Sequence, residues 1–175
     1  MNYFEFYELP ISFNPDQAVV KQQFYALSKK YHPDFYINED QATQDEVLEL
    51  STLNNKAFQV LKDPQKRLHY ILKLKNQINE EENYALPQNF LMEMMDVNEA
   101  LMDLEFEPDS SKIEDIKNQV NELEQNLAQE LANLTATFDQ ASVAEQDDLL
   151  TAIKDFYFRN KYLWRIKESL ARITS

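Results

Sequence analysis

Glycine and cysteine are both absent from this chain of 175 residues. Tight β-hairpins and phosphate-binding loops rely on glycine, because a residue without a Cβ adopts positive φ angles without steric cost and lets the backbone approach a ligand closely. The lack of glycine therefore predicts an all-α protein whose helices end at Asn, Asp and Pro. The lack of cysteine excludes disulfides, thiolate metal sites and cysteine nucleophiles.

Long apolar runs are also missing, so no segment of the sequence is suited to crossing a bilayer. Met1 leads into an acidic segment rather than a basic leader. We therefore expect a soluble, cytoplasmic protein without a membrane partner. Basic residues are few, with 17 Lys and Arg against 31 Asp and Glu. Because phosphate binding depends on Lys and Arg, we expect no nucleic-acid partner.

Charge is distributed unevenly along the chain. Residues 1–75 hold 9 basic and 10 acidic side chains, a net charge of −1, whereas residues 76–155 hold 3 and 20, a net charge of −17. Residues 156–175 hold 5 and 1, a net charge of +4. This difference in net charge between the blocks suggests separate modules. The acidic block keeps a helical periodicity of apolar residues, so we interpret its charges as a solvated helix face.

The boundary between the modules is expected at residues 76–86. There the acidic segment 79–83 interrupts the apolar pattern, and Pro87 then opens a new helix. We therefore predict a first domain over residues 1–75, a linker over residues 76–86, and a second domain over residues 87–175.

The first domain is predicted to contain an antiparallel helical hairpin and short helices. Apolar residues recur every three or four positions over residues 16–31 and again over residues 41–62, as in amphipathic helices. A short helix over residues 4–8 precedes the hairpin, and another follows Asp63-Pro64, which suit the N-cap and first helical position. The faces expected to meet are Val20, Phe24, Leu27 and Tyr31 from one helix and Leu50, Leu53, Ala57, Val60 and Leu61 from the other.

The tripeptide His32-Pro33-Asp34 separates the two hairpin helices. Proline cannot continue a helix from the preceding turn, so it holds its polar neighbours in an exposed turn. The helix before it has no acidic residue after its cap, and its polar face carries Lys21, Lys29 and Lys30. In an acidic chain this arrangement makes a local positive surface, for which we expect an acidic partner.

The motif Tyr31-His32-Pro33-Asp34, followed by NKAFQVLKDPQKR at residues 55–67, resembles the J-domain of DnaJ-type co-chaperones over about residues 2–75. The resemblance implies that His32, Pro33 and Asp34 dock on a DnaK-class chaperone and trigger its ATP hydrolysis. It also implies that the basic face formed by Lys21, Lys29 and Lys30 steers the encounter. None of these residues would perform chemistry itself.

The second domain is predicted to be a three-helix bundle, because three long helical patterns are separated by short breaks at residues 107–109 and near Gln140. The expected inner faces are Phe90, Met94, Val97, Leu101 and Leu104 in the first helix, Ile113, Ile116, Val120, Leu123, Leu127, Leu131, Leu134 and Phe138 in the second, and Leu149, Ile153, Phe156, Leu163, Ile166 and Leu170 in the third, which runs over about residues 143–173.

The first helix of this bundle has a second apolar stripe, formed by Leu91, Met95 and Met102. The stripe is flanked by Met92 and by three acidic residues, Asp96, Glu99 and Asp103. The stripe has two interpretations. It is either part of a wide core face, or a protein-binding surface, to which the flexible thioether of methionine is suited.

Three segments, residues 3–10, 67–72 and 90–99, resemble the HscB family of J-domain co-chaperones in iron–sulfur cluster biogenesis. The resemblance spans nearly the whole chain and implies a J-domain joined to a C-terminal three-helix domain. It implies two partners, an IscU-type scaffold protein and an HscA/DnaK-class chaperone ATPase, and no metal or cofactor. The implied scaffold-binding residues are Leu91, Met92, Met95, Asp96, Glu99, Asp103 and, from the last helix, Phe158. Met95 and Asp96 stand where the family pattern has Leu and Glu.

Three alternatives compete with this interpretation. His32 and Asp34 could form a catalytic acid–base pair, joined by His69 as a metal ligand, but Pro33 places them in a protruding turn without a nucleophile or a glycine-rich loop. We therefore expect no enzyme and no catalytic residues. A J-domain co-chaperone with a different client is the second alternative. The third alternative is a coiled-coil adaptor. It accounts for the apolar stripes of residues 113–138, but it gives no role to the exposed turn His32-Pro33-Asp34.

Overall fold

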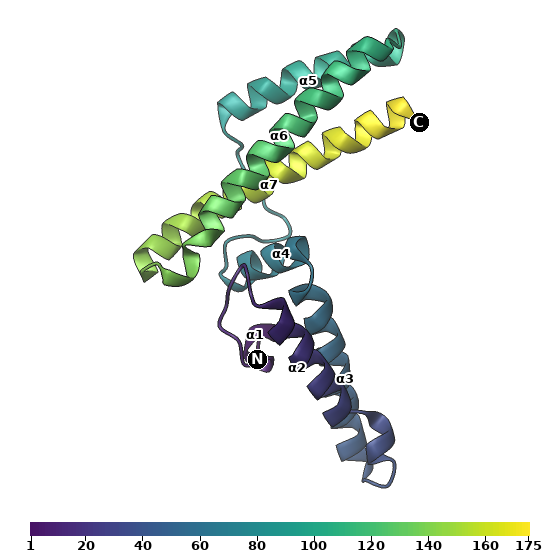
Figure 1. Ribbon diagram of the computed structural model, residues 1–175, viewed down its shortest axis with the longest axis vertical. Helices are drawn as coiled ribbons and strands as arrows, with labels where there is room; N and C mark the ends of the chain where they lie inside the picture. Colours follow the sequence, from purple (N-terminus) through teal and green to yellow (C-terminus); the bar gives the residue numbers. More distant parts are fainter. The chain divides into compact units, whose positions relative to one another are not determined.

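The computed structural model describes residues 1–175 and contains helices but no strands (Figure 1). The predicted all-α class is confirmed. The chain divides into two compact units, Met1–Asn76 and Gln77–Ser175, here called the N-terminal and C-terminal units. Glu8 and Asn76 adopt a positive φ, at 55° and 56°, so the fold needs the left-handed backbone angle that favours glycine at only these two positions. No helix has the length and apolarity needed to span a membrane.

The N-terminal unit is built on an antiparallel hairpin of α2 (Gln17–Lys30) and α3 (Gln41–Leu61). A short 3₁₀ helix, η1 (Pro33–Tyr36), joins the two at the tip of the hairpin. The short helix α1 (Tyr3–Phe6) and the helix α4 (Pro64–Leu74) both contact α3. In Figure 1, α1 and α4 lie away from the tip, toward the other end of the hairpin. The predicted hairpin and its flanking short helices are confirmed.

Aspartates cap three of these helices. The Asp16 carboxylate accepts a hydrogen bond from the Ala18 amide, and Asp63 accepts from the amides of Gln65 and Lys66, as predicted. Asp40 caps α3 in the same way, accepting from Thr43 at 2.7 Å, and this hydrogen bond lowers the pKa of Asp40.

One predicted boundary is wrong in the N-terminal unit. The helix expected over residues 4–8 ends at Phe6, because Tyr7 caps it and Glu8 takes a positive φ. The expected hairpin faces do meet. Val20, Ala57 and Leu61 are buried, while the other predicted face residues, Phe24, Leu27, Tyr31, Leu50, Leu53 and Val60, are half-buried.

A buried asparagine links three segments of the N-terminal unit. Asn54 of α3 is 1% exposed, and its side-chain carbonyl accepts a hydrogen bond from the Tyr7 hydroxyl at 2.8 Å. Its amide group donates to the Phe24 backbone carbonyl at 3.1 Å and to the Ser28 hydroxyl at 3.0 Å, both in α2. Burial raises the pKa of Tyr7, which keeps this donor protonated. Asn54 therefore satisfies polar groups that would otherwise be desolvated without partners.

A buried arginine holds the end of α3 in a similar way. The Arg67 guanidinium, in a side chain that is 7% exposed, donates to the backbone carbonyl of Phe13 at 2.9 Å and to that of Leu61 at 2.7 Å. Gln17 of α2 donates to the same Leu61 carbonyl at 3.2 Å. Because the last carbonyls of a helix have no partner within it, these donors stabilise the α3 terminus. Burial lowers the pKa of Arg67.

The C-terminal unit is a three-helix bundle of α5 (Gln88–Phe106), α6 (Ser110–Ala136) and α7 (Val143–Thr174), as predicted. The 3₁₀ helix η2 (Phe138–Gln140) precedes α7. Asp109 caps α6, and α7 begins with a capping box in which Ser142 and Glu145 exchange hydrogen bonds.

The core of the bundle follows the predicted stripes of α5 and α7 closely. The predicted stripe of the second helix is only half confirmed: Ile116, Val120, Leu127 and Phe138 are buried, with Phe138 in η2 rather than α6, whereas Ile113, Leu123, Leu131 and Leu134 are half-buried. All five predicted core residues of α5 are buried: Phe90, Met94, Val97, Leu101 and Leu104. In α7 one residue is corrected. Leu150, 3% exposed, is buried where the pattern had indicated Leu149, which is only half-buried. Leu149 and Leu150 lie four and three positions before the buried Ile153, and because both spacings fit one helix face the pattern alone does not distinguish them.

Replacing Asn54 by alanine tests its role in the N-terminal unit. We expect Asn54→Ala to reduce the free energy of unfolding by about 2 kcal/mol, because it removes the donor to the Phe24 carbonyl and the Ser28 hydroxyl and leaves Tyr7 only the backbone carbonyl of residue 54 as its acceptor. Hydrogen exchange of peptides from Met1–Asn76 measures the change. The control is Asn55→Ala, an exposed neighbour on the same helix. Equal exchange in the two variants would contradict the role of Asn54.

Candidate functional site

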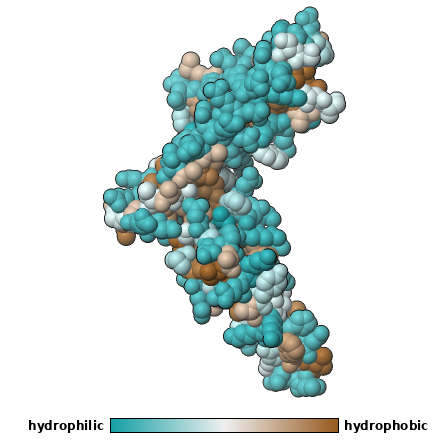
Figure 2. Space-filling view, viewed as in Figure 1, coloured by the Kyte–Doolittle hydropathy of each residue, from teal (hydrophilic) through white to brown (hydrophobic).

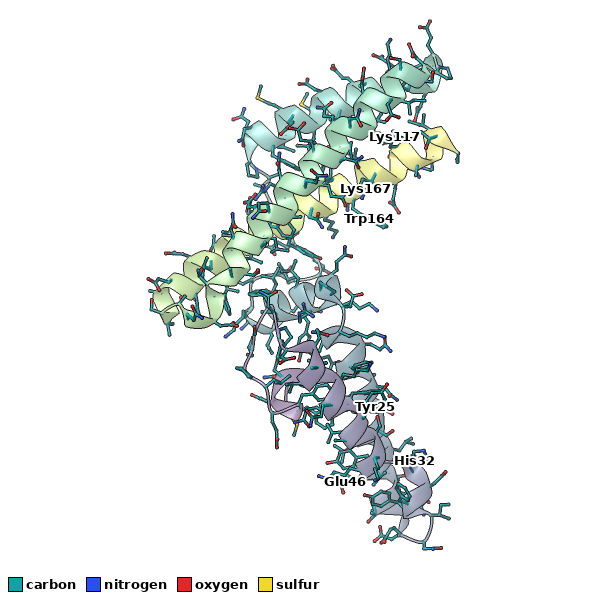
Figure 3. The ribbon with its side chains drawn as sticks, viewed as in Figure 1. Tyr25, His32, Glu46, Lys117, Trp164 and Lys167 are labelled. Atoms are coloured by element: carbon teal, nitrogen blue, oxygen red, sulfur yellow. The ribbon has the colours of Figure 1, made fainter.

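The His32-Pro33-Asp34 tip lies where α2 ends and η1 begins. Tyr31 caps α2, and His32 is the N-cap of η1, with Pro33 at its first position. The Asp34 amide donates to His32 Nδ1 at 3.3 Å, and the Phe35 amide donates to the His32 carbonyl at 3.1 Å. Figure 3 labels His32 near the end of the hairpin. Local hydrogen bonds thus set the backbone of the tip.

Both polar side chains of the tip project into solvent. The side chains of His32 and Asp34 are 52% and 78% exposed, and 3.7 Å separates His32 Nδ1 from Asp34 Oδ2. No group of three or more His, Cys, Asp or Glu side chains is placed to hold a metal ion, and His69 lies on α4 rather than at the tip. An acid–base pair this open to water cannot exclude solvent from a substrate. The geometry instead suits contact with a large partner.

The loop after the tip is tied to both hairpin helices. The Tyr36 hydroxyl donates to the Lys30 backbone carbonyl at the end of α2, at 2.7 Å. From α3, the Gln44 side chain donates to the backbone carbonyls of Ile37 and Glu39, at 3.1 and 2.9 Å. Because these contacts hold the loop before any partner arrives, binding incurs little further loss of conformational entropy.

The basic face of α2 is available to a partner. Lys21, Lys29 and Lys30 are all exposed, and none of them forms an ion pair with a carboxylate of the chain. Lys30 Nζ lies 5.1 Å from the ring centroid of Tyr31. Unpaired cations beside an exposed tip create a positive potential, which attracts an acidic surface.

The second apolar stripe of α5 is on the surface. Leu91 is 36% exposed and Met92, Met95 and Met102 are each 60–61% exposed. Of the two interpretations of this stripe, the wide core face is therefore wrong. Asp96, Glu99 and Asp103 are also exposed on this helix. We define the α5 surface as Leu91, Met92, Met95, Asp96, Glu99, Met102 and Asp103.

Phe158 of α7 is half-buried and held between aromatic neighbours. Its ring stacks on Tyr84 with a centroid separation of 4.6 Å, and the Tyr84 hydroxyl donates to Asp155 at 2.7 Å. Burial, followed by the hydrogen bond to Asp155, raises the pKa of Tyr84 to about 12. Asp155 also accepts from Arg159, which in turn binds Glu130 of α6. Tyr84 thus attaches residues before α5 to α7.

Phe158 also lines a groove of about 230 Å³ with Tyr84, Leu86, Tyr162 and Arg165. One turn along α7, the Tyr162 hydroxyl accepts a hydrogen bond from Asn98 of α5 at 3.0 Å, and its ring contacts Phe90 edge-on. Residues four positions apart share a helix face, so Phe158 is on the side of α7 that meets α5. Tyr84 is not among the residues predicted from the sequence, because it lies in the expected linker, where no periodic signal exists.

Tyr84→Phe tests this attachment. The substitution keeps the ring that stacks on Phe158 but removes the donor to Asp155, so we expect a loss of about 1 kcal/mol in the free energy of unfolding. Trp164, the single tryptophan, lies on α7, so its fluorescence during urea denaturation reports on the bundle. Tyr25→Phe is the matched control, since Tyr25 is 59% exposed in the N-terminal unit. A midpoint that shifts no more than in this control argues against the attachment.

Comparisons with known proteins cover both units. A family model described as "DnaJ domain" matches residues 3–70, and one described as "HSCB C-terminal oligomerisation domain" matches residues 86–171. The co-chaperone protein HscB homolog of Vibrio cholerae is 37% identical over 58% of this chain, and the alignment spans only 60% of that relative. The homolog of Pasteurella multocida is 31% identical, covering 88% of this chain and 91% of the relative.

A solved structure is similar as well. The crystal structure of human co-chaperone protein HscB superposes with a TM-score of 0.70 and 27% sequence identity, covering 98% of this chain and 81% of that one. The likeness extends over both units, because each comparison that covers most of the chain includes the hairpin as well as the bundle.

Proposed function

Because the chain belongs to the HscB family of J-domain co-chaperones, we propose that it binds an IscU-type iron–sulfur scaffold protein and delivers it to an HscA/DnaK-class chaperone ATPase. The observation that carries this proposal is the presence, in one chain, of an exposed His32-Pro33-Asp34 tip and an exposed apolar stripe on α5 that its own core does not use. The protein performs no catalysis itself.

The N-terminal unit acts on the ATPase. His32, Pro33 and Asp34 contact the chaperone and stabilise the conformation in which its bound ATP is hydrolysed, since a ligand shifts a conformational equilibrium by its difference in affinity for the two states. Lys21, Lys29 and Lys30 accelerate the encounter with an acidic surface, an effect that weakens as salt screens the charges.

The C-terminal unit holds the scaffold. Leu91, Met92 and Met95 are the apolar anchors, because a few side chains that become fully desolvated dominate the affinity of an interface. The acidic residues Asp96, Glu99 and Asp103 surround them and set orientation and association rate. Phe158 adds an aromatic contact from α7, with its ring kept in place by Tyr84.

The two activities combine in one sequence of events. The bundle captures the scaffold, and the tip then triggers ATP hydrolysis in the chaperone to which the scaffold is presented. Hydrolysis tightens the chaperone's hold on the scaffold and favours transfer of the cluster. The cluster is cargo of the scaffold and is not bound by the co-chaperone.

His32→Gln tests the role of the tip. We expect this variant to lose stimulation of the chaperone's ATPase while binding the scaffold as the unsubstituted protein does, because the α5 surface belongs to the other unit. Single-turnover ATP hydrolysis by the organism's own chaperone measures the effect. Asn38→Gln, an exposed polar substitution in the same loop, is the matched control. Full stimulation by His32→Gln would refute the docking role.

The double substitution Leu91→Ala and Met95→Ala tests the α5 surface. If both side chains are buried anchors in the complex, the affinity for the scaffold falls by about 2 kcal/mol or more, roughly 30-fold in Kd. Titration calorimetry measures it. Trp164→Ala removes an exposed apolar side chain from α7 and serves as the control.

Two outcomes of the titration would count against the scaffold assignment. An unchanged Kd in the double variant would remove Leu91 and Met95 from the interface. Absence of scaffold binding by the unsubstituted protein, together with intact ATPase stimulation, would favour a J-domain co-chaperone with a different client.

A further inference from the structure

A groove of about 290 Å³ lies beside the tip of the N-terminal unit, between the loop that follows η1 and the first turns of α3. Pro33 and Asp34 line its edge on the tip side, and Ile37, Val47 and Leu48 provide apolar surface. Val47 is 5% exposed and is part of the core. The groove is therefore continuous with the His32-Pro33-Asp34 tip on one side and with the core on the other.

Several large apolar side chains at or near this groove are exposed to solvent. Ile37 is 67% and Leu48 is 58% exposed, and Phe35, whose ring lies 5.7 Å from that of His32, is 68% exposed. Figure 2 shows hydrophobic side chains at the surface where the hairpin ends. Residues of the same types elsewhere in this unit, Phe4, Leu61 and Ile71, are fully buried. Apolar side chains gathered at a surface in this way mark interaction sites.

The groove is held open by the hydrogen bonds of the loop. Gln44, which lines the groove, donates to the backbone carbonyls of Ile37 and Glu39. The Tyr36 hydroxyl fixes the other side by donating to the Lys30 carbonyl. Ile37 thus faces a partner from a backbone that is already ordered, which reduces the entropy lost on binding.

The position and charge of the groove limit what can occupy it. Asp34 and Asp45 both line it, and their carboxylates disfavour a phosphate or another anion. Because Pro33 and Asp34 belong to the tip and to the groove at once, a protein large enough to grip the tip also covers the groove.

We infer that the groove receives an apolar side chain of the same chaperone ATPase that docks on His32-Pro33-Asp34, an inference that rests on the proposed function. Ile37 and Leu48 are the contacts that add affinity. The tip and the groove then have different roles. The tip alters the ATPase conformation, whereas the groove binds the chaperone equally before and after that change. Contacts of this second kind lower the concentration needed for half-maximal stimulation without altering the maximum.

The test is the double variant Ile37→Ser and Leu48→Ser, used in the full chain. We expect the co-chaperone concentration for half-maximal ATPase stimulation to rise about tenfold, with the maximal stimulation preserved. Both side chains are mostly exposed, so the unit is expected to fold, and circular dichroism checks this. Phe106→Ser, which removes an 83% exposed side chain from α5, is the matched control. The single variant Leu48→Ser, assayed alongside, should show a smaller shift in the same direction.

The outcomes separate this inference from the proposed function. If His32→Gln abolishes stimulation while the double variant shifts the half-maximal concentration by less than twofold, the groove is not part of the interface and the docking role of the tip stands. A lower maximum without a shift in concentration overturns the inference as well, because the groove would then act on the trigger. If His32→Gln stimulates fully, both the docking role and the groove assignment fail.

Discussion

The inability of Pro33 to continue α2 is the constraint on which the N-terminal unit depends. With its ring fixing φ and no amide to donate, proline ends the helix after Lys30 and begins a separate 3₁₀ turn. The loop after Pro33 is held in place by side-chain hydrogen bonds to backbone carbonyls. Tyr36 donates to the Lys30 carbonyl, and Gln44 donates to the Ile37 carbonyl. A proline that only interrupted a helix would leave a flexible loop, whereas this one produces a fixed projection.

The C-terminal unit carries more apolar surface on α5 than its core buries. Each helix of a three-helix bundle needs one buried stripe, and α5 supplies it with Phe90, Met94, Val97, Leu101 and Leu104. The additional leucine and methionines of this helix, Leu91, Met92, Met95 and Met102, are 36–61% exposed and are not among the buried residues of that core. An acidic chain that keeps such side chains in water, between carboxylates, keeps them where another protein can cover them. The two units therefore expose two different kinds of surface, a polar tip held by hydrogen bonds and a face of flexible apolar side chains.

Much of the fold was predictable from local patterns. Helix ends followed from residues that can act only locally, such as Asp16 and Asp63 as caps, and the buried stripe of α5 followed from a regular spacing of apolar residues. The errors were also local. The first helix is shorter than expected because Glu8 takes a positive φ. Leu149 was predicted in place of the buried Leu150 because both residues stand at a helical spacing, four and three positions, from Ile153.

The sequence by itself determined the helices, their approximate ends and the presence of a proline-bounded tip, since these depend on interactions between residues close in the chain. Only the tertiary structure decided that Leu91, Met92 and Met95 face solvent, that Tyr84 stacks on Phe158, and that Asn54 joins Tyr7 to α2. A periodic stripe shows which side chains share a face of one helix, but which face is buried depends on where the neighbouring helices pack. Contacts between residues dozens of positions apart leave no periodic signal, because they arise only once the chain has folded.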